Sequence, residues 1–319
     1  MGYYPCIYLD FKKIQGKNFE EFLIQFQNAM ADIYISHKYL LESNELQDID
    51  KEMMKKIINK ENNKLLLYNS IKFLIGFLYT YYNKYVMILI NSYDAPFLNA
   101  YNNGYEKEIT EFFSSFYKKF KDEPNVEKVI ISSELIPQKL RIIDDNNFMS
   151  STVLDNEFSD DFGITSTEMN KIISDFGIED KKEEIKKWYD GYKIGNIEEI
   201  YNPWSILKYL KERKLQPYWV NTSSNDLIKL ILKNSTTVKE KIERLLKDES
   251  VEVVVGQETV INGIEQNEDN IWGLLVGTGY LKVIEQVDLS TRLCKVAIPN
   301  LEIKDLFSNI VLGMVLNET

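Results

Sequence analysis

The sequence predicts an α/β protein in which a parallel sheet is followed by a helical region and then by a small α+β module. In the N-terminal half, short apolar runs alternate with segments of helical periodicity as far as Ser132, a pattern typical of parallel α/β sheets. The clearest strand, Tyr85–Ile90, is almost entirely apolar and precedes a turn-forming segment, as expected for a strand buried on both faces. After about Asp155 the pattern becomes mostly helical, and two apolar segments follow near the C-terminus.

The N-terminal elements follow from apolar spacing and capping residues. A helix is expected after Asn18, a favourable N-cap, because Phe22, Phe26, Met30 and Ile33 recur every three or four residues. The expected elements are, in order, a strand at Cys6–Phe11, helices at Phe19–Tyr39 and Leu65–Tyr82, a strand at Tyr85–Ile90, a helix at Tyr105–Phe120 and a strand at Val126–Ser132. Crossover helices are expected to cover both faces of the sheet.

The C-terminal half is expected to hold helices first and a mixed module last. The expected elements are helices at Thr165–Phe176, Lys181–Tyr189, Pro203–Arg213 and Ser224–Leu232, a strand at Val251–Val255, a helix at Glu268–Thr278, strands at Tyr280–Val287 and Leu293–Ile298, and a helix from Leu301. A helix followed by a two-stranded ribbon resembles a winged-helix module. The predicted boundaries are therefore 1–155 for the α/β core, 156–248 for a helical domain and 249–319 for a winged-helix-like module.

The most informative segment is Tyr85–Pro96, where the apolar strand turns polar at Asn91. In nucleotide-hydrolysing α/β proteins such a strand often ends in two acids, one that holds Mg²⁺ and one that orients the attacking water. Here Asn91 and Ser92 take those positions. Asp94 is the acid left near the carboxyl edge of the predicted sheet, where ligands of α/β folds bind. Its alternative interpretation is a turn residue before Pro96.

Several classes of chemistry lack the residues that they need. The phosphate-binding motif Gly-x-x-x-x-Gly-Lys-Ser/Thr does not occur, and its nearest fragment, Gly16-Lys17-Asn18, is interpreted as a turn before a helix. A single histidine, His37, and two distant cysteines, Cys6 and Cys294, exclude a His/Cys zinc site of familiar spacing. We therefore assign no catalytic residue and no metal ligand from the sequence.

The composition predicts a folded, cytoplasmic protein. The chain is 44% hydrophobic, and no apolar run reaches the roughly 18–20 residues of a membrane span. Two well-separated cysteines favour a reducing compartment, and the N-terminus has no signal-peptide pattern. The net charge of −11 makes nucleic acid an unlikely partner, because affinity for it depends on cations against phosphates.

Several motifs together resemble the AAA-ATPase-like family, relatives of the P-loop NTPases that are often fused to a PD-(D/E)XK nuclease-like domain. A Trp-Tyr-Asp-Gly-Tyr sequence followed shortly by Asn-Pro-Trp is improbable by chance. The matching segments run in order along essentially the whole chain: Tyr39–Ser43, Val86–Pro96, Trp188–Tyr192, Tyr201–Ile206, Trp219–Asn225, Asn267–Trp272, Thr278–Leu281 and Ile298–Asn300.

The resemblance implies a P-loop-NTPase-like core that lacks its first strand and its phosphate loop, which would lie upstream of Cys6–Phe11. It also implies that Asn91, Ser92 and Asp94 are degenerate nucleotide-binding positions, with two acids replaced and one retained. The sensor arginine of the family would fall on Leu135 or Ile136, within the segment Ser132–Pro137. The nuclease-like domain would begin near the end of the chain.

Three hypotheses follow. The first is a truncated, non-hydrolysing pseudo-ATPase that needs no cofactor and acts by binding an unknown protein partner. The alternative is a fragment of an active protein that binds and hydrolyses ATP with Mg²⁺, its phosphate loop encoded upstream and a nuclease-like domain downstream. The third is a nucleic-acid-binding module that uses the C-terminal region.

The tryptophans and one glycine of the motifs have plain structural interpretations. Large aromatic residues in a helical region are expected to build its core rather than contact a ligand, and Gly191 is expected to permit a turn after a helix. The tryptophans concerned are Trp188, Trp204, Trp219 and Trp272.

Overall fold

The structure is a computed structural model that describes residues 3–121, 123–133, 151–222, 228, 232, 235–256, 268–288 and 290–317. The chain divides into two compact units, Met1–Phe148 and Met149–Thr319, and each is described by itself. Within the described residues, no helix is both long and apolar enough to cross a bilayer.

The first unit contains a parallel sheet in the order β1-β2-β3, formed by β1 (Cys6–Asp10), β2 (Val86–Asn91) and β3 (Val126–Ile131). Ile7 pairs with Ile88, and Ile88 pairs with Val129. The predicted parallel α/β arrangement is therefore confirmed for this half of the chain.

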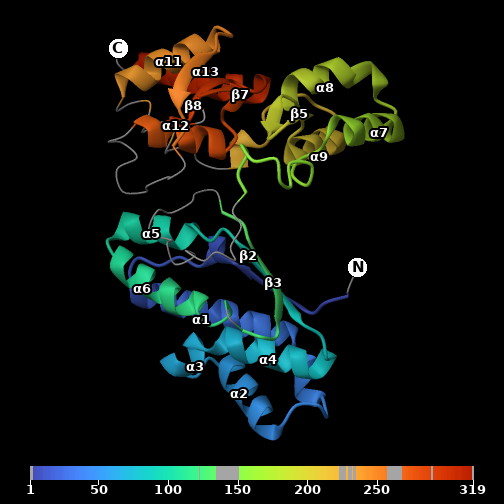
Figure 1. Ribbon diagram of the computed structural model, residues 1–319, viewed down its shortest axis with the longest axis vertical. Coiled ribbons are helices and arrows are strands. Elements are labelled where there is room, and N and C mark those ends of the chain that lie inside the picture. The colour runs from blue at the N-terminus through green and yellow to red at the C-terminus, as the bar shows by residue number, and fades with distance from the viewer. Residues whose placement is uncertain are drawn as a thin grey trace. The chain divides into compact units, whose positions relative to one another are not determined.

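Helices connect these strands and pack beside the sheet (Figure 1). The α-helices of this unit are α1 (Phe19–Ser36), α2 (Asp48–Ile58), α3 (Lys64–Tyr68), α4 (Ser70–Tyr82), α5 (Ala95–Asn103) and α6 (Glu106–Tyr117). Short 3-10 turns lie at η1 (Phe11–Lys13) and η2 (Lys38–Glu42). Two details differ from the sequence-based expectation: the helix expected at Leu65–Tyr82 breaks at Asn69, and α5 follows β2 directly, where only a turn was expected.

One face of the sheet is packed against an aromatic core. Ile7, Ile88 and Ile90 are buried on this face, α1 contacts β1 and α4 contacts β2. At the end of β1 the ring of Phe11 lies 5.0 Å from that of Phe113 and 6.4 Å from that of Phe26. Burial of large aromatic side chains of this kind supplies much of the hydrophobic stabilisation of a small domain.

The opposite face of the sheet is partly exposed. Tyr8, Leu89 and Ile130 form one row across the three strands; Tyr8 is 55% exposed and Ile130 is 48% exposed. β2 alternates between buried and half-buried residues, so the expectation that helices cover both faces is wrong for the described part of the unit. An apolar row of this kind is unusual for a parallel sheet, whose two faces are normally covered.

The second unit begins with a helical group that also holds a β-hairpin. Its elements are α7 (Ser166–Phe176), η4 (Glu179–Lys181), α8 (Lys182–Tyr189), β4 (Tyr192–Ile194), β5 (Ile197–Ile200), α9 (Pro203–Glu212) and η5 (Val220–Thr222). β4 and β5 pair antiparallel, a hairpin that the sequence analysis did not predict. Most of the helix expected at Ser224–Leu232 lies outside the described residues.

An antiparallel sheet with helices completes the second unit. Its elements are α11 (Thr236–Leu246), β6 (Val251–Val254), α12 (Glu268–Gly277), β7 (Lys282–Asp288), β8 (Leu293–Ala297) and α13 (Leu301–Asn317). The strand order is β6-β8-β7, so the expected ribbon is present with β6 added at its edge. The winged-helix identity and the boundary at 248/249 stay predictions.

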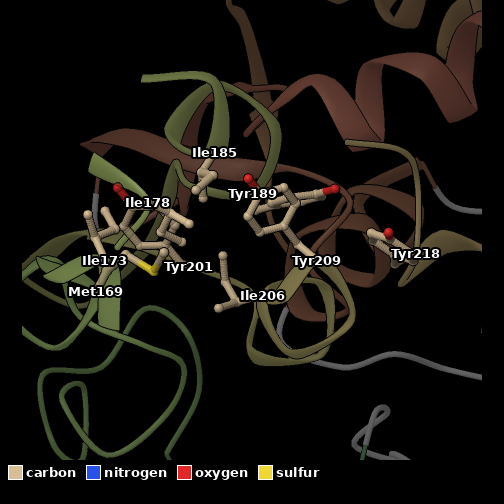
Figure 2. Close-up of a cluster of buried hydrophobic side chains, with 9 residues drawn as sticks. All are labelled: Met169, Ile173, Ile178, Ile185, Tyr189, Tyr201, Ile206, Tyr209 and Tyr218. Atoms are coloured by element: carbon tan, nitrogen blue, oxygen red, sulfur yellow. The ribbon is translucent and has the colours of Figure 1, made fainter. Parts of the chain in front are cut away.

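The helical group of the second unit packs around its own apolar cluster. Figure 2 shows Tyr189 and Tyr209 side by side above Ile206. Met169 and Ile173 of α7 belong to the same cluster. Tyr189 is fixed further, because its hydroxyl donates to the Gln216 carbonyl at 2.9 Å and accepts from the Gln216 N–H at 3.1 Å. The cluster holds α7, α8 and α9 together.

The structure confirms the expected burial for some of the tryptophans, and it explains why position 191 is a glycine. Trp272 is buried and Trp188 packs against the cluster of Figure 2, but Trp204 is exposed, contrary to expectation. Gly191 has a φ of +98°, and a Cβ atom there would lie 2.1 Å from the Pro299 carbonyl oxygen. A side chain at position 191 would therefore clash with the backbone of a distant segment as well as strain its own.

Candidate functional site

The carboxyl edge of the parallel sheet gathers polar residues from its strands. Asp10 ends β1 and pairs in register with Asn91, which ends β2. Ser132 follows β3, and its N–H donates to the Ile90 carbonyl at 2.8 Å. Because parallel strands present their carboxyl ends at the same edge, residues far apart in sequence meet here.

The side chain of Asn91 is hydrogen-bonded on both sides. Its Oδ1 accepts from the Ser132 hydroxyl at 2.7 Å, and its Nδ2 donates to Asp10 Oδ1 at 3.4 Å. The same Asp10 oxygen accepts the Lys12 N–H at 3.0 Å. The position that would carry a metal-binding acid is thus a neutral amide that links the ends of all three strands.

Ser92 occupies a strained turn directly after β2. Its φ is +52°, a left-handed conformation that costs energy for a non-glycine residue. Hydrogen bonds on either side fix the turn: the Ala95 N–H donates to the Ser92 carbonyl at 3.1 Å, and the Tyr93 N–H donates to the Ser132 carbonyl at 3.2 Å. Backbone strain of this kind concentrates at ligand-binding edges.

Asp94 is buried at the N-terminus of α5. Its residue is 3% exposed, and its backbone carbonyl accepts from the Phe97 and Leu98 N–H groups at the start of the helix. Its carboxylate does not cap the helix through a side-chain hydrogen bond, but negative charge at this end is favoured by the helix dipole. The structure thus places Asp94 in the turn between β2 and α5, and its role as a nucleotide-binding position stays a prediction.

The donor set at this edge suits Mg²⁺ poorly. It offers the Asp10 carboxylate, the Asn91 amide oxygen and the Ser132 hydroxyl, and the last two already bond each other. Protein sites for Mg²⁺ usually supply one or two carboxylates together with substrate phosphates. Among the described residues, no group of three or more His, Cys, Asp or Glu side chains is placed to hold a metal ion.

The Gly16 segment does not form a phosphate cradle. Its N–H donates to Asn99 Oδ1 at 3.0 Å, and its carbonyl accepts from the Tyr105 hydroxyl at 2.9 Å. A Cβ atom at this position would lie 2.4 Å from the Phe22 nitrogen, so glycine is needed for close packing against α1. The interpretation as a turn before a helix is confirmed, since α1 begins at Phe19 behind the Asn18 cap.

Sequence reasoning identified Asn91, Ser92 and Asp94 but missed Asp10 and Ser132. The structure brings Asn91 together with the two missed residues, and it places Asp94 at the start of the following helix. The missed signal was simple: each short apolar strand is followed by a polar residue, and parallel pairing brings these ends together.

Comparison with known proteins supports a family assignment for the first part of the chain. Residues 1–134 match the family described as Predicted AAA-ATPase. An uncharacterised protein encoded in the vnfD 5′ region of Azotobacter chroococcum mcd 1 is 24% identical over 223 residues, which cover 69% of this chain and 41% of that protein. This chain thus spans less than half the length of that relative, and no solved structure gives a significant match. Residues 1–134 are therefore similar to the family of predicted AAA-ATPases.

Proposed function

We propose that this protein is a non-hydrolysing AAA-ATPase-like protein that acts through binding, most simply of a protein partner in the cytoplasm. The observation that carries the proposal is the bonding of Asn91 to Asp10 and Ser132. This bonding supports the view that the polar groups at the edge of the sheet stabilise the fold instead of holding a metal ion.

The physical reason lies in how phosphoryl transfer is catalysed. Nearly all of the acceleration comes from positioning the phosphates and neutralising their charge with Mg²⁺ and cationic side chains. Asn91 brings no charge to the position where a metal-binding acid is expected, and Ser92 brings none to the next. The Gly16 backbone groups are already hydrogen-bonded within the fold, so they are not available to bind phosphate.

The alternative proposal is that the chain is part of a longer protein that binds and hydrolyses ATP. Two observations favour it: the chain spans 41% of its longer relative, and one face of the sheet is partly exposed at Tyr8 and Ile130. An added helix would cover such a face, and an added strand would extend the edge of the sheet. Under this alternative ATP and Mg²⁺ are the cofactors, and a nuclease-like domain follows.

Phosphate release from Mg-ATP tests the proposal. We expect the purified chain to release no phosphate above background, and we expect the double variant Asn91→Asp, Ser92→Glu to remain inactive because it still lacks a phosphate-binding loop. Turnover that requires Mg²⁺ and is abolished by Asp94→Asn would overturn the proposal. Turnover only in a protein extended by upstream coding sequence would favour the alternative.

A gel shift with duplex DNA at low salt tests the nucleic-acid-binding hypothesis. The net charge of −11 predicts no retention of the DNA. Retention that weakens steeply with salt would instead establish a basic surface on the protein.

A further inference from the structure

A cavity of about 200 Å³ lies inside the second unit, where the β4–β5 hairpin meets α12 and β7. Segments with no chain continuity converge on it, and the motifs of the family resemblance supply many of its walls. The motif residues Tyr192, Asn202, Pro203, Thr278 and Gly279 all line it. The motifs therefore share a place in the fold as well as an order in the sequence.

Most of the cavity wall is apolar. The apolar side chains come from the loop before α7, from β5, and from α12 and β7: Leu154, Phe162, Ile200, Val276, Leu281 and Val283. Phe162 is 59% exposed although its ring contributes to the wall. A partly open apolar wall of this kind favours a ligand with an apolar body, because contact removes both surfaces from water.

The charged side chains that line the cavity have one sign. Among the described residues that line it, there are two lysines, Lys193 and Lys282, and no aspartate or glutamate. This contrasts with the chain as a whole, which has 49 acidic and 38 basic residues. Lys193 is already engaged, since its Nζ lies 3.1 Å from Glu198 Oε1.

Of the two lysines that line the cavity, Lys282 is the one available to contact a ligand. No ion pair within 4.0 Å joins it to a carboxylate in the described part of the chain, although its charge acts on the buried Asp190 nearby. Its Nζ would lie 3.5 Å from a Cβ atom at position 191, so it stands beside the Gly191 turn at the cavity wall. A cation in a partly desolvated apolar site interacts strongly with an anion.

The segment Asp190–Tyr192, behind this wall, contains buried polar atoms whose hydrogen bonding is incomplete among the described residues. Asp190 is buried, and in the part of the chain that the structure describes its Oδ1 has no hydrogen-bond partner. The Tyr192 hydroxyl is also buried without a well-aligned partner, although the side-chain amides of Asn202 and Asn300 are near enough to moderate the rise that burial causes in its pKa. Orphaned polar atoms and a positive-φ glycine in one short segment are features that concentrate at functional sites.

We propose that this cavity binds a small organic anion with an apolar body, such as an aryl carboxylate, with Lys282 contacting the anionic group and the apolar wall contacting the body. The proposal concerns the second unit alone and does not depend on the function proposed for the sheet edge of the first. Carboxylate and phosphate groups both satisfy a lysine, so the probes must separate them.

Ligand-observed NMR on the full chain tests the proposal with four probes that share a phenyl ring: benzoate, phenyl phosphate, benzamide and benzylamine. We expect saturable binding of benzoate, of phenyl phosphate or of both, with the better of the two identifying the preferred anionic group. The neutral benzamide and the cationic benzylamine are expected to bind more weakly by roughly tenfold or more, the size of a charge-assisted contact.

Substitutions locate the binding. Lys282→Gln is expected to weaken binding of the anion by roughly tenfold or more. Phe162→Ala, at a position that is 59% exposed, is expected to weaken it through loss of the apolar contact. The matched control is Lys211→Gln, which removes the same charge from an exposed position of α9 outside the cavity and should leave binding unchanged. The proposal is overturned if folded wild-type protein binds neither anion, if benzamide binds as well as benzoate, or if Lys282→Gln binds as the wild type does.

Discussion

Ser205 and Glu302 lie 97 positions apart in the sequence and meet in the interior of the second unit, where the Ser205 hydroxyl donates to Glu302 Oε2 at 2.7 Å. The other carboxylate oxygen, Oε1, accepts the backbone N–H of Tyr218 at 2.6 Å and also those of Trp219 and Val220. Glu302 is completely buried. In the described part of the chain, this buried carboxylate is thus held by a hydroxyl and a run of backbone amides, with no cation paired to it.

Substitution of Glu302 should separate hydrogen bonding from charge. Glu302→Ala leaves the Ser205 hydroxyl and the backbone N–H groups without an acceptor, and we expect it to lower the free energy of unfolding by roughly 3–5 kcal/mol. Glu302→Gln keeps an oxygen for the amides and places its NH₂ against the Ser205 oxygen, so its cost at neutral pH should be within about 1 kcal/mol. Urea unfolding of the three proteins measures this; equal losses for Ala and Gln would show that the negative charge is required.

The pH dependence of the same comparison has a defined sign. Burial raises the pKa of Glu302 above its ordinary value of 4.5, despite the opposing effect of the hydrogen bonds from Ser205 and the backbone amides. The native state therefore holds a proton over a pH range in which the unfolded state has lost it, and this contribution to stability falls as the pH rises through that range. From about pH 4 to about pH 7, the stability of Glu302→Gln should increase relative to the wild type. If the stability of the two proteins depended on pH in the same way, the raised pKa of the buried Glu302 would be contradicted.

A negative charge at position 91 should be unfavourable in the first unit. In Asn91→Asp the new carboxylate would face Asp10, whose Oδ1 lies 3.4 Å from the present Asn91 nitrogen. We expect a loss of roughly 1–3 kcal/mol at neutral pH, reduced in acid as one of the pair protonates. Asn170→Asp, at an exposed position on α7, is the matched control and should change stability little.

The same pair of variants tests the metal question. Added Mg²⁺ should restore stability to Asn91→Asp, where two carboxylates would face each other, and should have little effect on the wild type or on Asn170→Asp. Stabilisation of the wild type by millimolar Mg²⁺, measured as a shift in the midpoint of urea unfolding, would show that the native donor set is sufficient.

The two faces of the parallel sheet should respond differently to the same substitution. Ile88 is fully buried and Ile130 is 48% exposed. Ile88→Thr places a hydroxyl in the core and should cost roughly 2–4 kcal/mol, whereas Ile130→Thr should change stability by less than about 1 kcal/mol. A large loss at Ile130 would indicate that its face is covered in the folded protein.

Local sequence signals predicted the sheet better than they predicted the site. The run Val86–Asn91 specified a strand on its own, because a short apolar segment beside turn residues has few other solutions. The β4–β5 hairpin was missed because Tyr192–Ile194 is too short to show a period, and its pairing depends on a positive φ at Gly195 and Glu199.

The contacts that the sequence did not predict depend on pairing between residues far apart in the chain. Nothing beside Asn91 in the sequence reveals that Asp10 and Ser132 will bond its amide, because their meeting depends on the register of parallel strands. The exposure of Trp204 has a similar origin. Its large side chain favoured burial, but α9 turns Ser205 and Ile206 inward instead.

The bonding of Glu302 also constrains the order in which the second unit can mature during synthesis. Tyr218, Trp219 and Val220 are translated long before the carboxylate that accepts their N–H groups. The Asp190 carbonyl likewise gains this partner only after Asn300 is translated, because Asn300 Nδ2 donates to it at 2.9 Å. A ribosome-bound chain that stops short of α13 therefore exposes an unfinished interior, and nascent chains of this length should be the ones that chaperones and proteases engage.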